Sequence, residues 1–118
     1  PKQLCRSNRM VDETSSTNDL ISVSEIDCII HEPARLVIMA HLYVVESADF
    51  LFLMRQTDLT FGNLSSHMSK LEQSGFISVE KEFDDRKPHT MLSLTKSGRA
   101  AFKDYRKRMR SLFEDLPD

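Results

Sequence analysis

The order of apolar and polar positions divides this 118-residue chain into two unequal parts. Residues 1–22 are polar and show no apolar periodicity, which predicts a flexible amino-terminal arm. Apolar residues then recur at regular spacing over residues 23–118, a length suited to one domain with a modest core.

Three helices are expected in the first half of that domain, over residues 24–31, 34–45 and 50–56. The first is short and carries Ile26 and Ile30 on one face. The second follows Pro33, a residue favoured at the first helical position, and is apolar almost all round, as is typical of a helix buried inside a domain. The third follows a turn whose Asp49 can cap it.

A fourth helix, residues 61–74, is expected between the cap residue Thr60 and Gly75, which accepts the left-handed conformation of a helix end. The period of the pattern then changes from 3.6 to 2, which predicts a hairpin. Its strands and its charged turn are expected over residues 76–83, 90–94 and 84–89, respectively.

A final helix is expected from Lys96 to about Phe113, with Thr95 as its cap. The chain is therefore predicted to be mostly α with one small β-hairpin. The third and fourth helices are joined by so few residues that they have the dimensions of a helix-turn-helix, and the hairpin that follows would be its wing.

Net charge does not point to nucleic acid, because 18 acidic residues outnumber 16 lysines and arginines. The distribution is more informative. Residues 12–58 hold nine acids and two bases, whereas residues 96–110 hold seven bases and one acid. A polyanion would be attracted to the second half. Two solvated faces of opposite charge would explain the pattern equally well.

The fourth predicted helix has two contrasting faces. One stripe is apolar, with Phe61, Leu64, Met68 and Leu71 at spacings of 3, 4 and 3. The opposite arc and its flanks carry small, polar or basic residues: Gly62, Asn63, Ser65, Ser66, His67, Ser69, Lys70 and Gln73. That arc lacks acids and large apolar groups, so it suits close approach to a DNA groove. The alternative is an ordinary amphipathic surface helix.

The hairpin tip offers a second candidate contact. Arg86 and Lys87 can reach a minor groove, whose negative potential attracts arginine. Asp84 and Asp85 weaken this electrostatic argument, although an aspartate can also orient Arg86. A solvated turn with a local Asp–Arg pair is the alternative.

The final helix carries a longer apolar stripe than one small domain needs: Phe102, Tyr105, Met109 and Leu112. A partner subunit is one way to cover it, with Ile26 and Ile30 joining the dimer interface. Packing of the stripe onto residues 24–31 of the same chain is the alternative, and both arrangements can hold at once.

Residues 32–108 resemble the winged helix-turn-helix repressors of the MarR and ArsR kind, including the compact subgroup known as the winged helix DNA-binding domain. The resemblance covers about two thirds of the chain. Three stretches carry it: Ile29-Ile30-His31-Glu32-Pro33-Ala34-Arg35-Leu36, Thr60-Phe61-Gly62-Asn63-Leu64-Ser65-Ser66-His67-Met68-Ser69-Lys70-Leu71-Glu72-Gln73-Ser74-Gly75-Phe76-Ile77, and Leu94-Thr95-Lys96-Ser97-Gly98-Arg99.

This resemblance implies a homodimer with recognition helices in successive major grooves and wings in the flanking minor grooves. The residues that match the family's DNA-contacting helix are Asn63, Ser65, Ser66, His67 and Lys70, and Arg86 matches the wing arginine. We add Thr60, Gly62 and Lys87 to the predicted DNA-binding residues. The wing departs from the family pattern, because it is expected to be short and its two acids precede the basic pair.

The predicted function is sequence-specific binding of double-stranded DNA by a cytoplasmic transcriptional repressor, without a cofactor. No catalytic motif suggests an enzyme. Alternatives are a protein–protein interaction module and a metal- or redox-sensing repressor, but Cys5, Cys28 and the four histidines lack ligand spacing. No apolar run is long enough to span a membrane. A small-molecule effector stays open, because no polar cluster marks a pocket for one.

Overall fold

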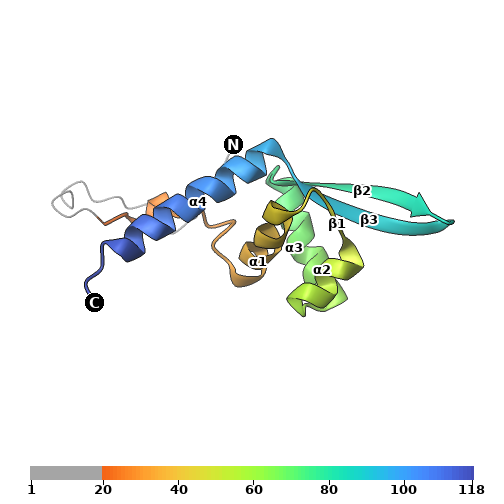
Figure 1. The fold of residues 1–118 in the computed structure, drawn as a ribbon, viewed down its shortest axis with the longest axis horizontal. Helices are drawn as coiled ribbons and strands as arrows, with labels where there is room; N and C mark the ends of the chain where they lie inside the picture. Colours follow the sequence, from red (N-terminus) through yellow and green to blue (C-terminus); the bar gives the residue numbers. More distant parts are fainter. Residues whose placement is uncertain (1–19) are drawn as a thin grey trace.

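The computed structural model describes residues 20–118, so most of the predicted arm and Cys5 lie outside the described residues. In the described part the helices are α1 (Pro33–Val44), α2 (Phe50–Thr57), α3 (Phe61–Gln73) and α4 (Lys96–Glu114), preceded by a short 3-10 turn, η3 (Val23–Glu25) (Figure 1). The strands are β1 (Ala48–Asp49), β2 (Ile77–Asp84) and β3 (Lys87–Leu94).

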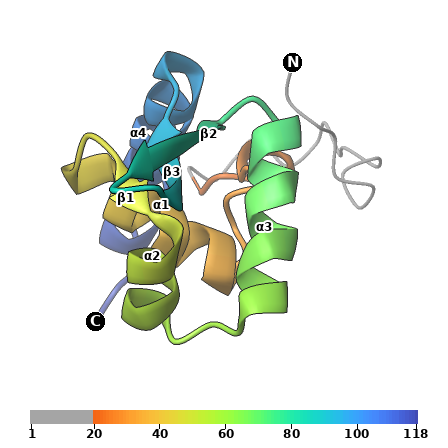
Figure 2. The same ribbon diagram turned by 90° about the vertical axis from the view of Figure 1, so that its right-hand side faces the viewer.

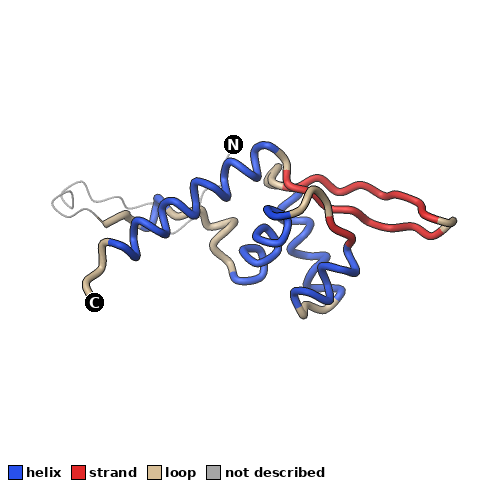
Figure 3. Tube along the Cα trace, viewed as in Figure 1, coloured by secondary structure: helices blue, strands red, loops and turns tan. Residues whose placement is uncertain are grey.

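The predicted fold class, mostly helical with a hairpin wing, is confirmed. The strands form one antiparallel sheet in the order β1-β3-β2. Figure 3 shows that β2 and β3 project together far beyond the helices, so only the base of the sheet packs on the helical body. The same strands therefore serve the core at one end and form a protruding arm at the other.

The core lies where α1 meets α2, α3 and β3. Its fully buried side chains are Ile30, Ile38, Met39, Leu42, Leu53, Leu64, Leu71 and Leu92. The predicted burial of the second helix on all sides is wrong. In α1, Val37 and Val44 are 42% and 78% exposed, because neighbouring elements cover only one side of the helix.

The predicted helix over residues 24–31 is replaced by η3 and a turn. The carboxylate of Asp27 accepts hydrogen bonds from the backbone N–H groups of Ile29 and Ile30, at 2.9 and 3.3 Å. A side chain that binds these donors offers the backbone an alternative to a helix. The apolar pattern was still informative, because Ile29 and Ile30 are buried.

The segment before α2 forms a strand that the sequence pattern did not predict. Ala48 and Asp49 pair with Leu92 and Met91 of β3. The predicted cap is nevertheless present, since the Asp49 carboxylate accepts from the N–H groups of Leu51 and Phe52 at 2.9 and 3.2 Å.

The wing is longer than predicted, with eight residues in each strand. Of the residues predicted to form the turn, Asp84 belongs to β2 and Lys87, Pro88 and His89 belong to β3. Pro88 pairs with Phe83, one step from the closing pair of Asp84 and Lys87. In a two-residue hairpin such a position does not donate to the partner strand, so the missing N–H of proline is tolerated.

A close junction fixes α4 against the end of α3. Gly75 has φ +80° and follows α3, as predicted. The backbone carbonyl of Phe76 accepts from the N–H of Thr95 at 3.0 Å, and the Thr95 hydroxyl donates to the Gly75 carbonyl at 2.7 Å. A Cβ on Gly98 would lie 1.9 Å from the Phe76 carbonyl oxygen, so only glycine fits there.

Within residues 20–118, none of the helices combines the length and the apolar character that crossing a membrane requires.

Candidate nucleic-acid interface

Helices α2 and α3 form the predicted helix-turn-helix. Asp58 ends α2 in the left-handed conformation, with φ 61°, and its N–H donates to the Met54 carbonyl at 3.0 Å. Thr60 begins α3 as predicted, because its hydroxyl accepts from the N–H of Asn63 at 3.1 Å. The two caps make a short, defined turn that fixes how α3 stands on the body.

One side of α3 is anchored in the core and the other faces outward (Figure 2). Leu64 and Leu71 are fully buried, and Met68 packs against the core. Phe61 was predicted to share this stripe but is 64% exposed, with its ring centroid 5.0 Å from that of Phe50.

The structure brings most of the predicted α3 site together on the outward side. The exposed members are Thr60, Gly62, Asn63, Ser66 and Lys70. Ser65 and His67 are half-buried and flank them. Glu72 is exposed in the last turn, so the acid-free surface is confined to the first three turns. Apart from Phe61 near its start, the outward surface, Thr60–Lys70, is thus small, polar and basic.

An arginine from α1 completes this surface, and sequence reasoning missed it. Arg35 lines an open hollow on the protein surface with five residues of α3: Ser66, His67, Ser69, Lys70 and Gln73. Its Nη1 lies 3.3 Å from Nδ1 of His67, and its Nε donates to the Ile29 carbonyl at 2.6 Å. Arg35 is one of only two basic residues among residues 12–58, and this unusual position in an acidic segment could have marked it as a candidate DNA contact.

Glu32 stands beside this pair. Its carboxylate accepts from the backbone N–H of Arg35 at 2.8 Å and caps α1. The same oxygen, Oε1, lies 3.8 Å from His67 Nδ1. The carboxylate therefore serves the start of α1, and the Arg35 guanidinium is directed to His67 and Ile29.

Arg86 and Lys87 are exposed where β2 turns into β3. That end of the wing lies well away from α3 (Figure 1). Asp85 and Arg86 are the two central residues of the turn and both have positive φ, 52° and 68°. A two-residue hairpin turn of this kind strongly favours asparagine, aspartate and glycine. An arginine therefore holds an uncommon backbone conformation at the tip.

The two faces of the wing differ in charge, because side chains alternate across a strand. One face carries the acidic residues of β2, namely Glu80, Glu82 and Asp84. Their cross-strand partners on β3, which lie on the same face, are Met91, His89 and Lys87, respectively. The other face carries two cross-strand pairs, Lys81 with Thr90 and Phe83 with Pro88, and none of these four is acidic. The acids predicted to weaken DNA contact are thus partly segregated from one side of the wing.

Strand β3 is tied to the start of α2 part of the way along the wing. Nδ1 of His89 lies 3.1 Å from Oδ1 of Asp49. Partial burial raises the pKa of Asp49, but hydrogen bonds from His89 and from the N–H groups of Phe52 and Leu51 outweigh it, so the pKa lies below its usual value. The cap therefore favours an ionised Asp49.

The predicted dimer residues fall into two groups. Ile30, Phe102 and Tyr105 are buried within the chain. Tyr105 is hydrogen-bonded to Nδ1 of His31 at 2.8 Å. Ile26, Met109 and Leu112 are half-buried, and beyond them Phe113 and Leu116 are 62% and 47% exposed. The intramolecular alternative thus accounts for the first half of the α4 stripe, and the second half stays accessible.

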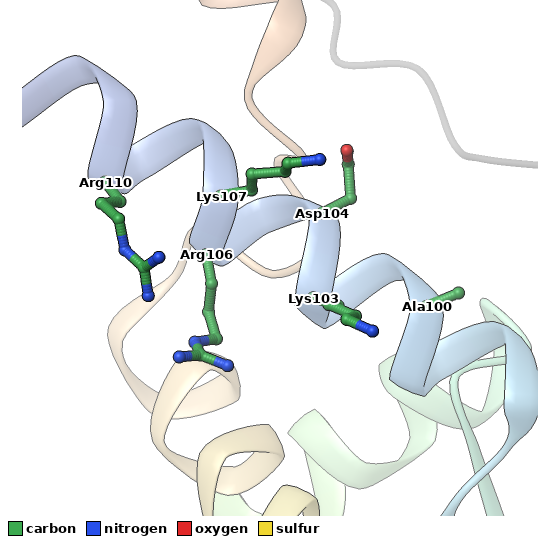
Figure 4. Close-up of a pocket in the computed structure, with 6 residues that line it drawn as sticks. All are labelled: Ala100, Lys103, Asp104, Arg106, Lys107 and Arg110. Carbon is green, nitrogen blue, oxygen red and sulfur yellow. The ribbon is translucent and has the colours of Figure 1, made fainter.

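A shallow groove runs along the opposite side of α4, lined by Ala100, Lys103, Asp104, Arg106, Lys107 and Arg110 (Figure 4). Figure 4 shows Arg106 and Arg110 projecting toward the side on which α1 lies. The guanidinium carbons of Arg99 and Arg106 lie 4.6 and 5.8 Å from the ring centroid of Tyr43. Most of the basic residues of α4 therefore lie along this groove, on the side of the helix opposite its apolar stripe.

Among residues 20–118, no group of three or more histidines, cysteines, aspartates or glutamates is arranged to hold a metal ion. Cys28 is half-buried in the turn before α1.

Comparison with known proteins gives consistent results. Residues 34–113 match the family described as the winged helix DNA-binding domain. An uncharacterized protein of Methanocaldococcus jannaschii is 38% identical over 77 residues, which cover 65% of this chain and 84% of that protein. The solved structure of a transcriptional regulator homologue from Pyrococcus horikoshii has a TM-score of 0.71 and 33% identity, and the match covers 75% of this chain and 90% of that one.

A protein assigned to the MarR family of transcriptional regulators, from Enterococcus faecalis, shares the fold with a TM-score of 0.62 and 24% identity over 74% of this chain and 77% of its own. The family match covers more than half of the present chain, and the fold and the outward surface of α3 agree with it. The family is one of transcriptional regulators and not of enzymes. The chain belongs to the winged helix DNA-binding domain family and is a DNA-binding transcriptional regulator that shares its fold with the MarR-family protein.

Proposed function

We propose that this chain binds a specific double-stranded DNA operator as a homodimer and represses transcription. The observation that carries the proposal is the outward surface of α3, Thr60–Lys70, where small polar and basic side chains stand on a helix anchored by Leu64 and Leu71. A helix that enters a major groove needs such a combination, a fixed inner side and an outer side without bulk or negative charge.

The residues of this surface divide by chemistry. Asn63 is exposed in the first turn of α3 and suits bidentate pairing with adenine. Ser66 can bond to several base edges or to phosphate, and Lys70 acts as a phosphate cation. Gly62 meets no other atom within 4 Å of its Cβ position, so its value lies in allowing close approach of DNA. Thr60 and Ser65 flank these contacts.

The wing supplies the second proposed contact. Arg86 and Lys87 stand at the end of two eight-residue strands, which extend about 26 Å at the usual rise per residue. That reach suits contact with the groove next to the one that α3 occupies. Narrow minor grooves attract arginine, and Arg86 is one of the two central residues of the turn at the tip.

The proposed dimer interface is the second half of the α4 stripe with the segment before α1. Met109 and Leu112 with Ile26 form its half-buried part, and the exposed Phe113 and Leu116 continue it. For recognition of two half-sites, an isologous contact there has to hold two α3 helices about one DNA turn, 34–36 Å, apart. The operator is then expected to be an inverted repeat.

Repression requires only that the dimer occupies a promoter, which a DNA-binding domain can do unaided. We assign the protein to the cytoplasm on the basis of this role. A protein-interaction module is the second candidate function, but its outward α3 surface would be expected to carry large apolar side chains. Here Phe61 is the one exposed large apolar side chain of Thr60–Lys70, and the other exposed members are threonine, glycine, asparagine, serine and lysine.

Selection of bound fragments from a random DNA pool, at 150 mM salt, tests the proposal. The expected product is an inverted repeat with half-site centres about 10 base pairs apart. In a promoter fusion, that sequence should lower expression only when the protein is present. Recovery of unrelated fragments after repeated rounds would contradict sequence-specific binding.

A further inference from the structure

The hollow between α1 and α3 has the composition of a phosphate site. Six residues line it, Arg35, Ser66, His67, Ser69, Lys70 and Gln73. Two of them are cations, two carry hydroxyls and none is acidic. Arginine and lysine are the side chains that bind DNA phosphate oxygens most often, and serine hydroxyls donate to them. The cations come from different helices, so the hollow exists only when α1 and α3 are packed together.

Arg35 is held in place by two groups that leave part of its guanidinium available. Nε donates to the Ile29 carbonyl at 2.6 Å, and Nη1 lies 3.3 Å from His67 Nδ1. A guanidinium has five N–H donors in a planar fork, so donors remain for an anion. A side chain fixed in this way loses less conformational entropy when it binds than a free surface arginine.

His67 has a defined part in this arrangement. A guanidinium only donates, so in this contact Nδ1 of His67 is the acceptor and Arg35 is the donor. The side chain of His67 is 21% exposed, much less than expected for a residue that reaches into a groove. Its geometry thus fits orientation of Arg35 better than direct contact with a base.

We propose that this hollow binds a single phosphate of the operator backbone, with Arg35 and Lys70 as its cations, and that His67 is a positioning residue for Arg35. This inference rests on the proposed function. It assigns a DNA-contacting role to a residue of α1 and changes the role expected for His67 from contact to orientation.

The test uses the full chain and a duplex carrying the selected operator, in which one phosphate at a time is replaced by a neutral methylphosphonate. Wild type should lose about tenfold in affinity when the phosphate in the hollow is neutralised, as for a charge-assisted hydrogen bond. Arg35→Gln should bind more weakly and lose clearly less than wild type at that position, because only Lys70 is left to interact with the phosphate. Its plot of log K against log salt should be shallower by about 0.9.

His67→Asn keeps an acceptor near the position of Nδ1, whereas His67→Leu removes it. The leucine variant should show the same loss of the single-phosphate effect as Arg35→Gln, with the preferred sequence unchanged, and the asparagine variant should restore it. A change of preferred base in His67→Asn would overturn the positioning role, because it would indicate base contact.

Arg110→Gln is the matched control, since it removes one arginine from the far side of α4 and should keep the wild-type methylphosphonate profile. Arg35→Lys serves if Arg35→Gln does not fold; it keeps the charge without the fork and should reduce the single-phosphate effect by about half or more. Identical profiles in wild type and both Arg35 variants would overturn the inference. Absence of specific DNA binding by wild type would instead contradict the proposed function.

Discussion

Nδ1 of His31 lies 2.8 Å from the hydroxyl oxygen of Tyr105, and this hydrogen bond joins the segment before α1 to the middle of α4. Beside it, the rings of Phe102 and Tyr43 pack with centroids 5.3 Å apart. The first half of α4 is therefore part of the core of one chain. Only the half beyond Tyr105 is available to a second copy.

Tyr105→Phe should lower the free energy of unfolding by about 1 kcal/mol, since it removes one hydrogen bond and retains the ring. Burial, and secondly the negative charge of Asp27, raise the pKa of Tyr105 above its ordinary value of 10.0. A group with a raised pKa contributes stability below its unfolded pKa and loses it as pH rises. Denaturant unfolding should therefore show the gap between wild type and variant closing above pH 10.

As a control, the difference in free energy of unfolding between wild type and Tyr105→Phe is measured at pH 7 and pH 8, where it should be constant. A gap that widens above pH 10 would contradict the assignment of the raised pKa to the folded state.

Gly98→Ala should destabilise the protein by about 2 kcal/mol or more, because overpacking against backbone forces α4 to shift. The added Cβ would lie 1.9 Å from the Phe76 carbonyl oxygen. Gly62→Ala is the matched comparison, since its Cβ would meet nothing within 4 Å. It should stabilise α3 by about 0.5–1 kcal/mol and yet weaken operator binding, because the methyl group faces the DNA.

Thermal unfolding should show that Gly98→Ala lowers the stability of the protein and that Gly62→Ala raises it. Fluorescence anisotropy titration should show that Gly62→Ala weakens operator binding. Operator affinity unchanged by Gly62→Ala would argue that α3 does not approach DNA closely at this turn.

Asp49→Ala should cost about 1 kcal/mol through loss of the α2 cap. The pKa of Asp49 is lowered in the folded protein, chiefly by the His89 hydrogen bond against the opposing effect of burial. Its contribution is therefore present above the unfolded pKa, near 3.8, and is lost as pH falls through the folded pKa. Stability measured from pH 6 to pH 3 should show wild type converging on the variant at the acid end. Parallel curves would contradict the role of the ionised carboxylate.

Leu112→Glu should convert the proposed homodimer to a monomer, because it places a charge in the accessible half of the α4 stripe. Sedimentation measures the mass directly. Arg110→Glu is the control on the opposite side of α4 and should leave the dimer intact. A dimer that persists in Leu112→Glu would move the interface elsewhere.

How much the sequence revealed depended on whether the signal was local. The caps at Thr60 and Thr95 and the helix end at Gly75 were predicted correctly, since each depends on a side chain and the next three or four residues. The conformation of residues 24–31 was not predicted correctly, because the side chain of Asp27 binds backbone N–H groups that a helix would have used.

Long-range pairing also escaped the pattern. The two-residue strand β1 forms only because β3 lies beside it. Pro88 was predicted to lie in the turn, but its position opposite Phe83 in the hairpin tolerates proline. In the site, the outward α3 residues followed from helical periodicity. The part played by Arg35 could not be predicted from periodicity, because its contact with His67 joins residues that are 32 positions apart in the sequence.

The most direct test of the central claim, that α3 reads base sequence through its outward surface, is the affinity of wild type, Asn63→Ala and Lys70→Ala for the selected operator and its single-base variants at fixed salt. Asn63→Ala should tolerate substitutions at one base pair of each half-site that cost wild type about 1–3 kcal/mol. Lys70→Ala should weaken binding to all duplexes about equally, as expected for a phosphate contact. An unchanged ranking of the duplexes by Asn63→Ala, with affinity also unchanged, would contradict readout by α3.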